Sequence, residues 1–318
     1  MAVMRLSAPD AGRRRAFLCR SAATALALGM AGCSAAAPAK PRRELWLDPV
    51  FGLSGARLTD KTDPTGFPLP GGKESFVYFQ FPVAVVASLE SIFIADAGTG
   101  RLFRYVQSSG LMTAIPGVRV RPGMRLQAAL DGTVFALDAM GGEISRYSMQ
   151  GIPLPAMQPR MPGSRYLDFA IDLQSGTVLA VDAVYRVVDR IEPMGRIAIV
   201  HMNLGTTGPL ALDGSLLVVA DAQCKCVSEW RGGRMLRRLA VGLIRLPKAL
   251  AAEKGEIYVL DGFDRSISRV SEGGLETIIA ADLNLVSPEQ MTVAGGMMYV
   301  ADGAGRKVMA FKIRRRQD

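Results

Sequence analysis

A single pattern recurs six times between residues 93 and 311 of this chain. In each copy a short apolar run ends in an aspartate, and hydrophobic residues follow six and nine positions later. The aspartates are Asp96, Asp138, Asp182, Asp221, Asp261 and Asp302, and successive copies lie 42, 44, 39, 40 and 41 residues apart. The copies align without insertion from four residues before the aspartate to nine after it. Such a period predicts an array of equivalent supersecondary units.

Each copy has the composition of four short strands. The run before the aspartate is rich in β-branched and aromatic residues, which is typical of a strand covered on both faces. A glycine-containing turn such as residues 97–100 leads into a second strand, and further apolar runs such as 83–86 and 111–115 flank this hairpin. Four strands at this period predict an all-β fold, a six-bladed β-propeller of four-stranded antiparallel blades.

The sixth copy lacks an outer strand, because the apolar pattern stops at residues 311–313 and a basic tail follows. An unpaired strand edge would be left open there. We therefore predict that an N-terminal strand closes the ring. Residues 44–51 are the first candidate for that strand, and residues 76–79 are the alternative.

Two segments carry a family resemblance. Residues 298–311 (MYVADGAGRKVMAF) and 93–105 (FIADAGTGRLFRY) resemble the NHL repeat. Members of that family form six-bladed propellers, so the resemblance implies this fold over residues 80–313. The Asn that the family usually carries three residues after the aspartate is absent from all six copies, which makes this a divergent version.

The first 32 residues have the composition of an export signal. Several arginines precede an apolar stretch at residues 22–31 that is too short to span a bilayer as a mature helix. Residues 14–18 (RRAFL) also resemble the twin-arginine export motif. We predict that residues 1–32 are a cleaved signal peptide and that the protein leaves the cytoplasm.

The end of this segment resembles a bacterial lipobox. Residues 29–33 read GMAGC, with Met where the family usually has Leu, and the resemblance implies that Cys33 becomes the first mature residue and carries acyl chains. Ser34 resembles the residue that sorts lipoproteins to the outer membrane. We expect a tether at residues 33–43 followed by a propeller at residues 44–318. The protein should be anchored to a membrane on its periplasmic side, and Ser34 predicts that this is the outer membrane.

The net charge is +9, and removal of residues 1–32 takes away five Arg and one Asp, which leaves +5. This excess includes the basic tail at residues 314–316, which we expect to be solvated, with contact to anionic lipid headgroups as the functional alternative. We expect no nucleic-acid partner.

The six repeat aspartates are expected to be structural. An Asp that ends a strand before a turn accepts hydrogen bonds from the backbone N–H groups of that turn. A catalytic carboxylate should be an exception to the repeat, whereas these six define it. We therefore assign no catalytic, cofactor-binding or metal-binding residue.

Zinc and calcium chemistry can be weighed from the ligands available. The single histidine, His201, argues against a zinc enzyme, because tetrahedral zinc sites take four ligands from Cys, His or carboxylate groups and zinc enzymes of this fold use clusters of histidines. A calcium site of the lactonase type would need several side-chain oxygens. The candidates, all expected in loops that precede a new blade, are Asn203, Asn284, Asp168, Asp172, Asp282 and Glu289.

Three other features leave alternatives open. Cys224 and Cys226 form a C-x-C pair that could be a local disulfide, a partial metal site or two free thiols. Four copies carry an arginine eight residues after the aspartate, expected to be structural through blade-to-blade ion pairs or a basic girdle: Arg104, Arg146, Arg190 and Arg269. Three segments depart from the repeat and are candidate binding loops: residues 62–72, 152–155 and 159–163.

These observations predict a lipid-anchored binding or assembly platform in the bacterial envelope, with a protein, peptide or glycan as partner. The alternative is a calcium-dependent lactonase-like or lyase-like enzyme that uses channel carboxylates, and a purely structural envelope component is the third reading. The channel separates the first two: an enzyme needs converging oxygens on the axis, whereas small apolar residues there favour the platform.

Overall fold

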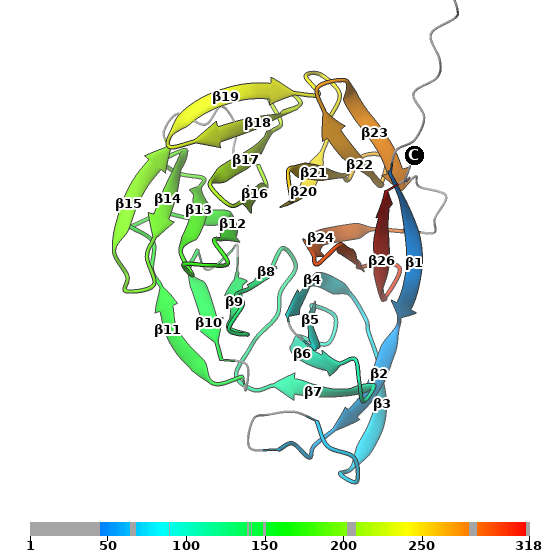
Figure 1. The fold of residues 1–318 in the computed structure, drawn as a ribbon. Helices are drawn as coiled ribbons and strands as arrows, with labels where there is room; N and C mark the ends of the chain where they lie inside the picture. The colour runs from blue at the N-terminus through cyan, green and yellow to red at the C-terminus, as the bar shows by residue number, and fades with distance from the viewer. Residues whose placement is uncertain are drawn as a thin grey trace, which may run out of the picture. The chain divides into compact units, whose positions relative to one another are not determined.

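The computed structural model describes residues 45–63, 68–88, 90–138, 140, 142–148, 151–201, 208–279 and 285–315. The chain divides into two units, residues 1–42 and 43–318, and all the described residues belong to the second. This unit is a ring of six β-sheets around a central axis (Figure 1). No helix among the described residues is long and apolar enough to cross a membrane.

Each blade is an antiparallel sheet whose first strand lies innermost. The first blade contains β4 (Pro82–Ser88), β5 (Ser91–Asp96), β6 (Arg101–Val106) and β7 (Leu111–Ile115), and the second contains β8 (Arg125–Ala128), β9 (Val134–Leu137), β10 (Ile144–Tyr147) and β11 (Pro153–Met157). The third blade contains β12 (Tyr166–Ile171), β13 (Val178–Asp182), β14 (Val187–Ile191) and β15 (Ile197–His201), and the fourth contains β16 (Leu210–Asp213), β17 (Leu216–Asp221), β18 (Cys226–Arg231) and β19 (Arg234–Leu239). The fifth blade contains β20 (Pro247–Glu253), β21 (Glu256–Asp261), β22 (Ser266–Ser271) and β23 (Gly274–Ile279). The six-bladed propeller is confirmed.

The sixth blade combines the two ends of the described chain. It contains β24 (Pro288–Ala294), β25 (Met297–Asp302), β26 (Lys307–Arg315) and, as its outer strand, β1 (Leu45–Leu53). β1 pairs antiparallel with β26 from Leu45 opposite Arg315 to Leu53 opposite Val308, with an irregularity between Pro49 and Phe51. The first candidate for the closing strand, residues 44–51, is therefore confirmed, and the alternative at 76–79 is wrong.

The alternative segment has a different place, at the outer edge of the first blade. β2 (Gly55–Thr59) pairs in parallel with β7, and β3 (Glu74–Tyr78) pairs antiparallel with β2. These two strands widen the first sheet to six strands (Figure 1).

The core lies between neighbouring blades. Ile92, Ile94 and Phe103 of the first blade pack against Tyr299 and Ala301 of the sixth. Comparable clusters join the first and second blades and the fourth and fifth blades. Because each sheet is covered on both sides, its central strands read as continuous apolar runs in the sequence.

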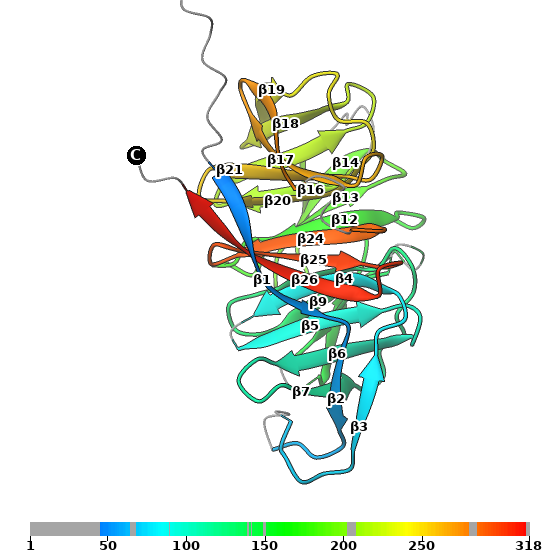
Figure 2. The same cartoon turned by 90° about the vertical axis from the view of Figure 1, so that its right-hand side faces the viewer.

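The strand directions divide the connections between two faces of the ring. All innermost strands begin at one face, here called the loop face, which carries the loops between blades and the turn after each repeat aspartate. The opposite face, here called the turn face, carries the turns between the first and second strands. β1 begins and β26 ends at the turn face, since Leu45 pairs with Arg315 (Figure 2).

One expected binding loop needs correction. Residues 153–155 are not a binding loop, because they lie in β11, where prolines are tolerated at the outer edge of the sheet. The first residue of the basic tail, Arg314, is exposed, as expected of a solvated tail. Arg314 belongs to β26 and its Nε lies 2.9 Å from Oδ2 of Asp48 in β1.

Candidate functional site

The repeat aspartates face backbone amides at the loop face. Oδ1 of Asp96 accepts hydrogen bonds from the N–H groups of Phe81 (2.8 Å) and Gly98 (3.0 Å), and Oδ2 accepts from Gln80 N (2.9 Å). One carboxylate thereby joins the loop that enters the blade to the turn within it. Asp96 is fully buried. These contacts support the structural interpretation of the repeat.

The contact with the turn recurs in the other five blades, and Asp261 and Asp302 also bind amides of the entry loop. Asp261 accepts from Arg245 N, Leu246 N and Phe263 N, at 2.7, 3.0 and 2.9 Å. Asp302 accepts from the amides of residues 286, 287 and 305. Asp138 accepts from Met140 N and pairs with Arg121 Nη1 at 3.1 Å, and Asp221 accepts from Gln223 N. Asp182 accepts from Val184 N at 2.9 Å.

An arginine closes the channel near the loop face. Arg125 projects from β8 in the second blade and donates from Nη1 to the carbonyl of Glu289 (2.8 Å) and from Nη2 to the carbonyl of Lys248 (3.0 Å). Those acceptors belong to the sixth and fifth blades, so one guanidinium spans the axis. Gln290 of β24 also joins different blades, because it donates to Leu126 O in the second blade (3.0 Å) and accepts from Val85 N in the first blade (3.2 Å).

The acids beside this arginine are already engaged. Glu289 Oε2 lies 3.0 Å from Lys248 Nζ, and Glu289 Oε1 accepts from Ser287 Oγ at 2.6 Å. Asp168 on β12 accepts from Leu210 N (3.1 Å) and Phe169 N (3.0 Å). Burial raises the pKa of Asp168, against an opposing effect of nearby Arg125 and of the two backbone hydrogen bonds.

Below this polar plug, the channel opens to the turn face as a cup of about 210 Å³. Its wall is formed by the ends of the six innermost strands and consists mainly of small and aliphatic side chains, including Ala87, Ala128, Ala211, Ala251 and Ala294. Such a surface offers little for acid–base chemistry or for a hard cation.

The predicted calcium ligands do not form one group. Asp168 and Glu289 both lie near Arg125, on strands rather than in loops, whereas Asp172 follows β12 at the turn face and accepts from Gln174 N. Asn203, Asn284 and Asp282 lie outside the described residues. Among the residues that the structure describes, no three His, Cys, Asp or Glu side chains gather in a way that could hold a metal ion.

The repeated arginines make contacts within their own blades. Arg104 is buried and donates to Ser91 Oγ, Arg146 donates to Pro155 O, and Arg190 pairs with Glu192. Arg269 pairs with Glu256 (2.7 Å) and Glu276 (3.4 Å). The contacts of Arg104, Arg146 and Arg269 link neighbouring strands of one sheet, whereas Arg190 pairs with a residue just after its own strand. None of these contacts is an ion pair between blades.

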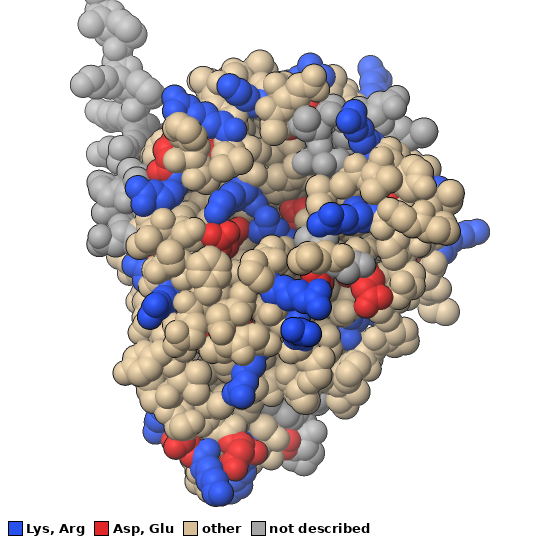
Figure 3. Space-filling view, turned by 180° about the vertical axis from the view of Figure 1, so that it is seen from behind, with Lys and Arg blue, Asp and Glu red and all other residues tan. Residues whose placement is uncertain are grey.

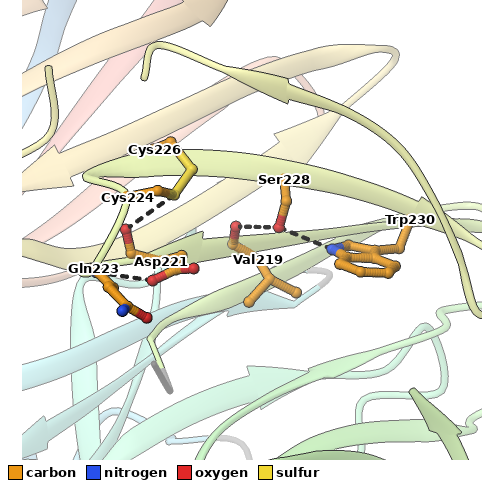
Figure 4. Close-up of a disulfide and its surroundings, with 7 residues drawn as sticks. All are labelled: Val219, Asp221, Gln223, Cys224, Cys226, Ser228 and Trp230. Atoms are coloured by element: carbon orange, nitrogen blue, oxygen red, sulfur yellow. Dashed lines mark hydrogen bonds between the residues drawn. A yellow bond between two sulfur atoms is a disulfide. The ribbon is translucent and has the colours of Figure 1, made fainter. Parts of the chain in front are cut away.

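Cys224 and Cys226 are joined in a disulfide at the loop-face turn of the fourth blade (Figure 4). In the same blade, Trp230 Nε1 donates to Ser228 Oγ at 2.8 Å, and Ser228 donates to Val219 O. His201 is the last residue of the outer strand β15, away from the innermost strands that line the channel.

The loop face carries a set of cations that the sequence analysis missed. The fourth residue after the repeat aspartate has positive φ in all six copies, and it is Gly in two blades and a cation in four: Arg186, Lys225, Arg265 and Arg306. All four side chains are exposed. The signal was present in the sequence, but only the turn geometry shows its meaning. Figure 3 views this face and shows Lys and Arg side chains distributed around its centre.

Comparisons with known proteins extend only to the fold. No family model and no curated protein matches the chain. Among solved structures, a catalytically inactive histidine-to-alanine variant of virginiamycin B lyase from Staphylococcus aureus, with quinupristin, is 11% identical, with 84% of this chain and 98% of that chain covered and a TM-score of 0.58. A gluconolactonase from Xanthomonas campestris is 13% identical, with 82% and 99% covered and a TM-score of 0.58.

A third neighbour comes from a protein assembly. A chain of the nidogen/laminin complex is 17% identical, with 71% of this chain and 92% of that chain covered and a TM-score of 0.54. The likeness establishes the six-bladed propeller scaffold of this chain. Because enzymes and a protein complex share that scaffold, the function must be argued from the surface of this molecule.

Proposed function

We propose that the protein is an extracytoplasmic, lipid-anchored propeller that binds a partner protein and serves as an assembly platform in the bacterial envelope. The observation that carries the proposal is the state of the channel. Its two described acids, Asp168 and Glu289, are bound to amides, a lysine and a serine, and Arg125 fills the axis beside them. The remaining cup is apolar. Recognition is therefore assigned to the faces of the ring.

The enzyme alternative has less support from the described residues. Replacing a histidine inactivates the virginiamycin B lyase in the comparison, whereas the one histidine of this chain ends an outer strand. A lactonase of the calcium type would need converging oxygens, and the described residues contain no such group.

The platform and its anchor can be tested together in a double-membrane bacterium. We expect the wild-type chain to sediment with membranes, to resist a high-salt wash and to dissolve in detergent, whereas Cys33→Ala should lose the membrane association. Chemical cross-linking before extraction should recover one partner in stoichiometric amount. A second lipid-anchored protein of similar abundance is the control bait.

The same purified protein serves for the enzyme test. With glucono-δ-lactone and added Ca²⁺, we expect hydrolysis at the rate of buffer alone. Hydrolysis that requires Ca²⁺ and is lost in the Asp168→Asn variant would refute the platform proposal and support the enzyme alternative. Recovery of no specific partner, together with an unanchored wild-type chain, would also refute the proposal.

A further inference from the structure

The turn after each repeat aspartate contains a position where glycine is the least strained choice. An L-residue at positive φ meets a steric clash between its Cβ and its own backbone, which glycine avoids. The first and second blades place Gly100 (φ 70°) and Gly142 (φ 75°) there. The other four blades place a cation at φ between 50° and 58°. Since glycine would relieve the turn, the needs of the fold do not explain why four blades carry a cation there.

More cations share the same face. Arg101 follows the turn of the first blade, and Arg119 and Arg245 lie in loops between blades; all three are exposed. Together with Arg186, Lys225, Arg265 and Arg306 they make up what is here called the cationic rim. Among the residues that the structure describes, no rim member has an ion-pair partner. The repeat aspartates at this face turn toward backbone amides, as described above for Asp96 and Asp261.

The turn face has the opposite tendency. Five of its six turns between first and second strands carry or adjoin an acid: Glu90, Asp131, Asp172, Asp213 and Glu253. Some of these acids cap the next blade, as Glu253 does by accepting from the amides of Gly295 (2.7 Å) and Gly296 (3.0 Å). The turn face therefore mixes acids with exposed cations, whereas the rim cations of the loop face have no acid paired with them among the described residues.

Large apolar side chains lie among the rim cations. Phe263 is 61% exposed and Val184 is 56% exposed, and both belong to rim turns. The guanidinium of Arg245 lies 4.6 Å from the ring centre of Phe263, and that of Arg160 lies 5.9 Å from the ring centre of Tyr185. Six of the seven rim cations are arginines. Arginine with exposed aromatic and aliphatic side chains is the composition of protein interfaces, where lysine is depleted.

From these observations we propose that the loop face is the docking surface of the platform, and that its partner is a protein that presents carboxylates around an apolar patch. This rests on the proposed function. The point at which the chain enters the ring favours a protein, rather than the anchoring membrane, as the partner of the loop face. β1 begins at the turn face, so the chain enters the ring on the side opposite the proposed docking surface.

The test uses the purified full chain in detergent and a random copolymer of glutamate and tyrosine as the probe. Binding is measured by fluorescence anisotropy at about 50 mM NaCl, where screening is moderate. The test variant combines Arg186→Gly, Lys225→Gly, Arg265→Gly and Arg306→Gly. The matched control removes four exposed cations from the turn face and its outer turns, through Arg196→Gln, Arg231→Gln, Arg234→Gln and Lys254→Gly. Lys254 also has positive φ (55°), so the control includes the same backbone change.

We expect the test variant to bind the copolymer at least about tenfold more weakly, because four exposed ion pairs are lost, and the control to stay within about twofold of wild type. The test variant should melt at the same or a higher temperature, because glycine relieves the turn. Polyglutamate without tyrosine should bind more weakly than the copolymer, and Phe263→Ala should reduce that difference. Equal copolymer binding by the wild type and the test variant would overturn the proposal.

Two further probes decide the class of partner. Phosphatidylglycerol vesicles that bind more tightly than the copolymer would make the face a membrane contact, and tighter binding of polygalacturonate would make it a glycan site; either result overturns the proposal. The cross-linking experiment separates this inference from its premise. If the test variant still captures the partner, the platform function is supported and the assignment of the loop face as the docking surface is refuted. If the wild-type protein captures no partner, both proposals are refuted.

Discussion

At the residue scale, the carboxylate of Asp302 shows what the repeat position does. It is fully buried and accepts hydrogen bonds from Val286 N, Ser287 N and Gly305 N at distances of 2.7 to 3.2 Å. A buried amide N–H that loses such a charged acceptor has no hydrogen-bond partner left, either in the protein or in water, and this costs free energy. The residue therefore holds the entry loop of its blade and the turn of the same blade in one arrangement.

We expect Asp302→Ala to lower the free energy of unfolding by about 3 kcal/mol, because several amides lose a charged partner at once. Urea unfolding followed by circular dichroism would measure the loss. The control is Asp131→Ala, where an exposed carboxylate accepts only from Thr133 N (2.8 Å) among the described contacts, and we expect a change within about 1 kcal/mol. Equal effects of the two substitutions would contradict the role given to Asp302.

Asp168 should make the stability of the protein depend on pH. Its pKa in the folded protein is raised, chiefly by burial, above the ordinary value of 3.8. The folded state then binds more protons than the unfolded state in the pH window that starts near 3.8 and extends upward to the folded pKa. The stability contributed by this group therefore falls as pH rises through that window. We expect Asp168→Asn to flatten the dependence of the unfolding midpoint on pH above about 4, and Asp131→Asn to leave it unchanged.

At the element scale, β1 decides whether the ring closes. It pairs along the length of β26 and contributes Leu47, Phe51 and Leu53 to clusters that include residues of neighbouring strands. Without β1, the last blade would end in an open edge and the apolar side of β26 would face water. The strand thus ties the beginning of the ring to its end.

We expect removal of residues 1–53 to cost about 5 kcal/mol and to lower the melting temperature by at least about 10 °C, through lost pairing and apolar burial. Differential scanning calorimetry would show the shift. A synthetic peptide of residues 44–53 added in excess should restore part of it, because it can occupy the vacated edge. A peptide of the same composition in scrambled order is the control, and equal rescue by both would refute register-specific closure.

At the scale of the whole molecule, Arg125 connects blades that lie across the ring from one another. Its acceptors are 123 and 164 residues away in the sequence. Since the carbonyls of Lys248 and Glu289 belong to the fifth and sixth blades, the arginine holds the axis at a fixed width. It also offsets part of the cost of burying Asp168.

Arg125→Met should lower the free energy of unfolding at pH 7 by about 2 kcal/mol or more, because two carbonyls lose a charged donor and Asp168 loses its neighbouring cation. Combining it with Asp168→Asn should recover part of this loss. Chemical unfolding of the four proteins gives the coupling free energy, which we expect to exceed about 0.5 kcal/mol. Strictly additive effects would show that the two side chains do not interact.

The sequence alone determined the number of blades, the four strands in each and the need for a closing strand. These features are recorded locally, because a strand covered on both faces has the same apolar pattern wherever it stands, and a period near 40 residues repeats it. The cation four residues after the aspartate was visible in four copies, but a cation in a turn has no meaning until the backbone φ and the shared face are known.

Only the tertiary structure decided how distant residues meet. The choice of residues 45–53 over 76–79 for closure, the added hairpin of β2 and β3, and the reach of Arg125 across the channel all depend on pairings between segments far apart in the chain. Periodicity describes neighbours along the chain and carries no information about which carbonyl lies opposite an arginine. The cationic rim likewise arises because ring closure brings six equivalent turns to one side.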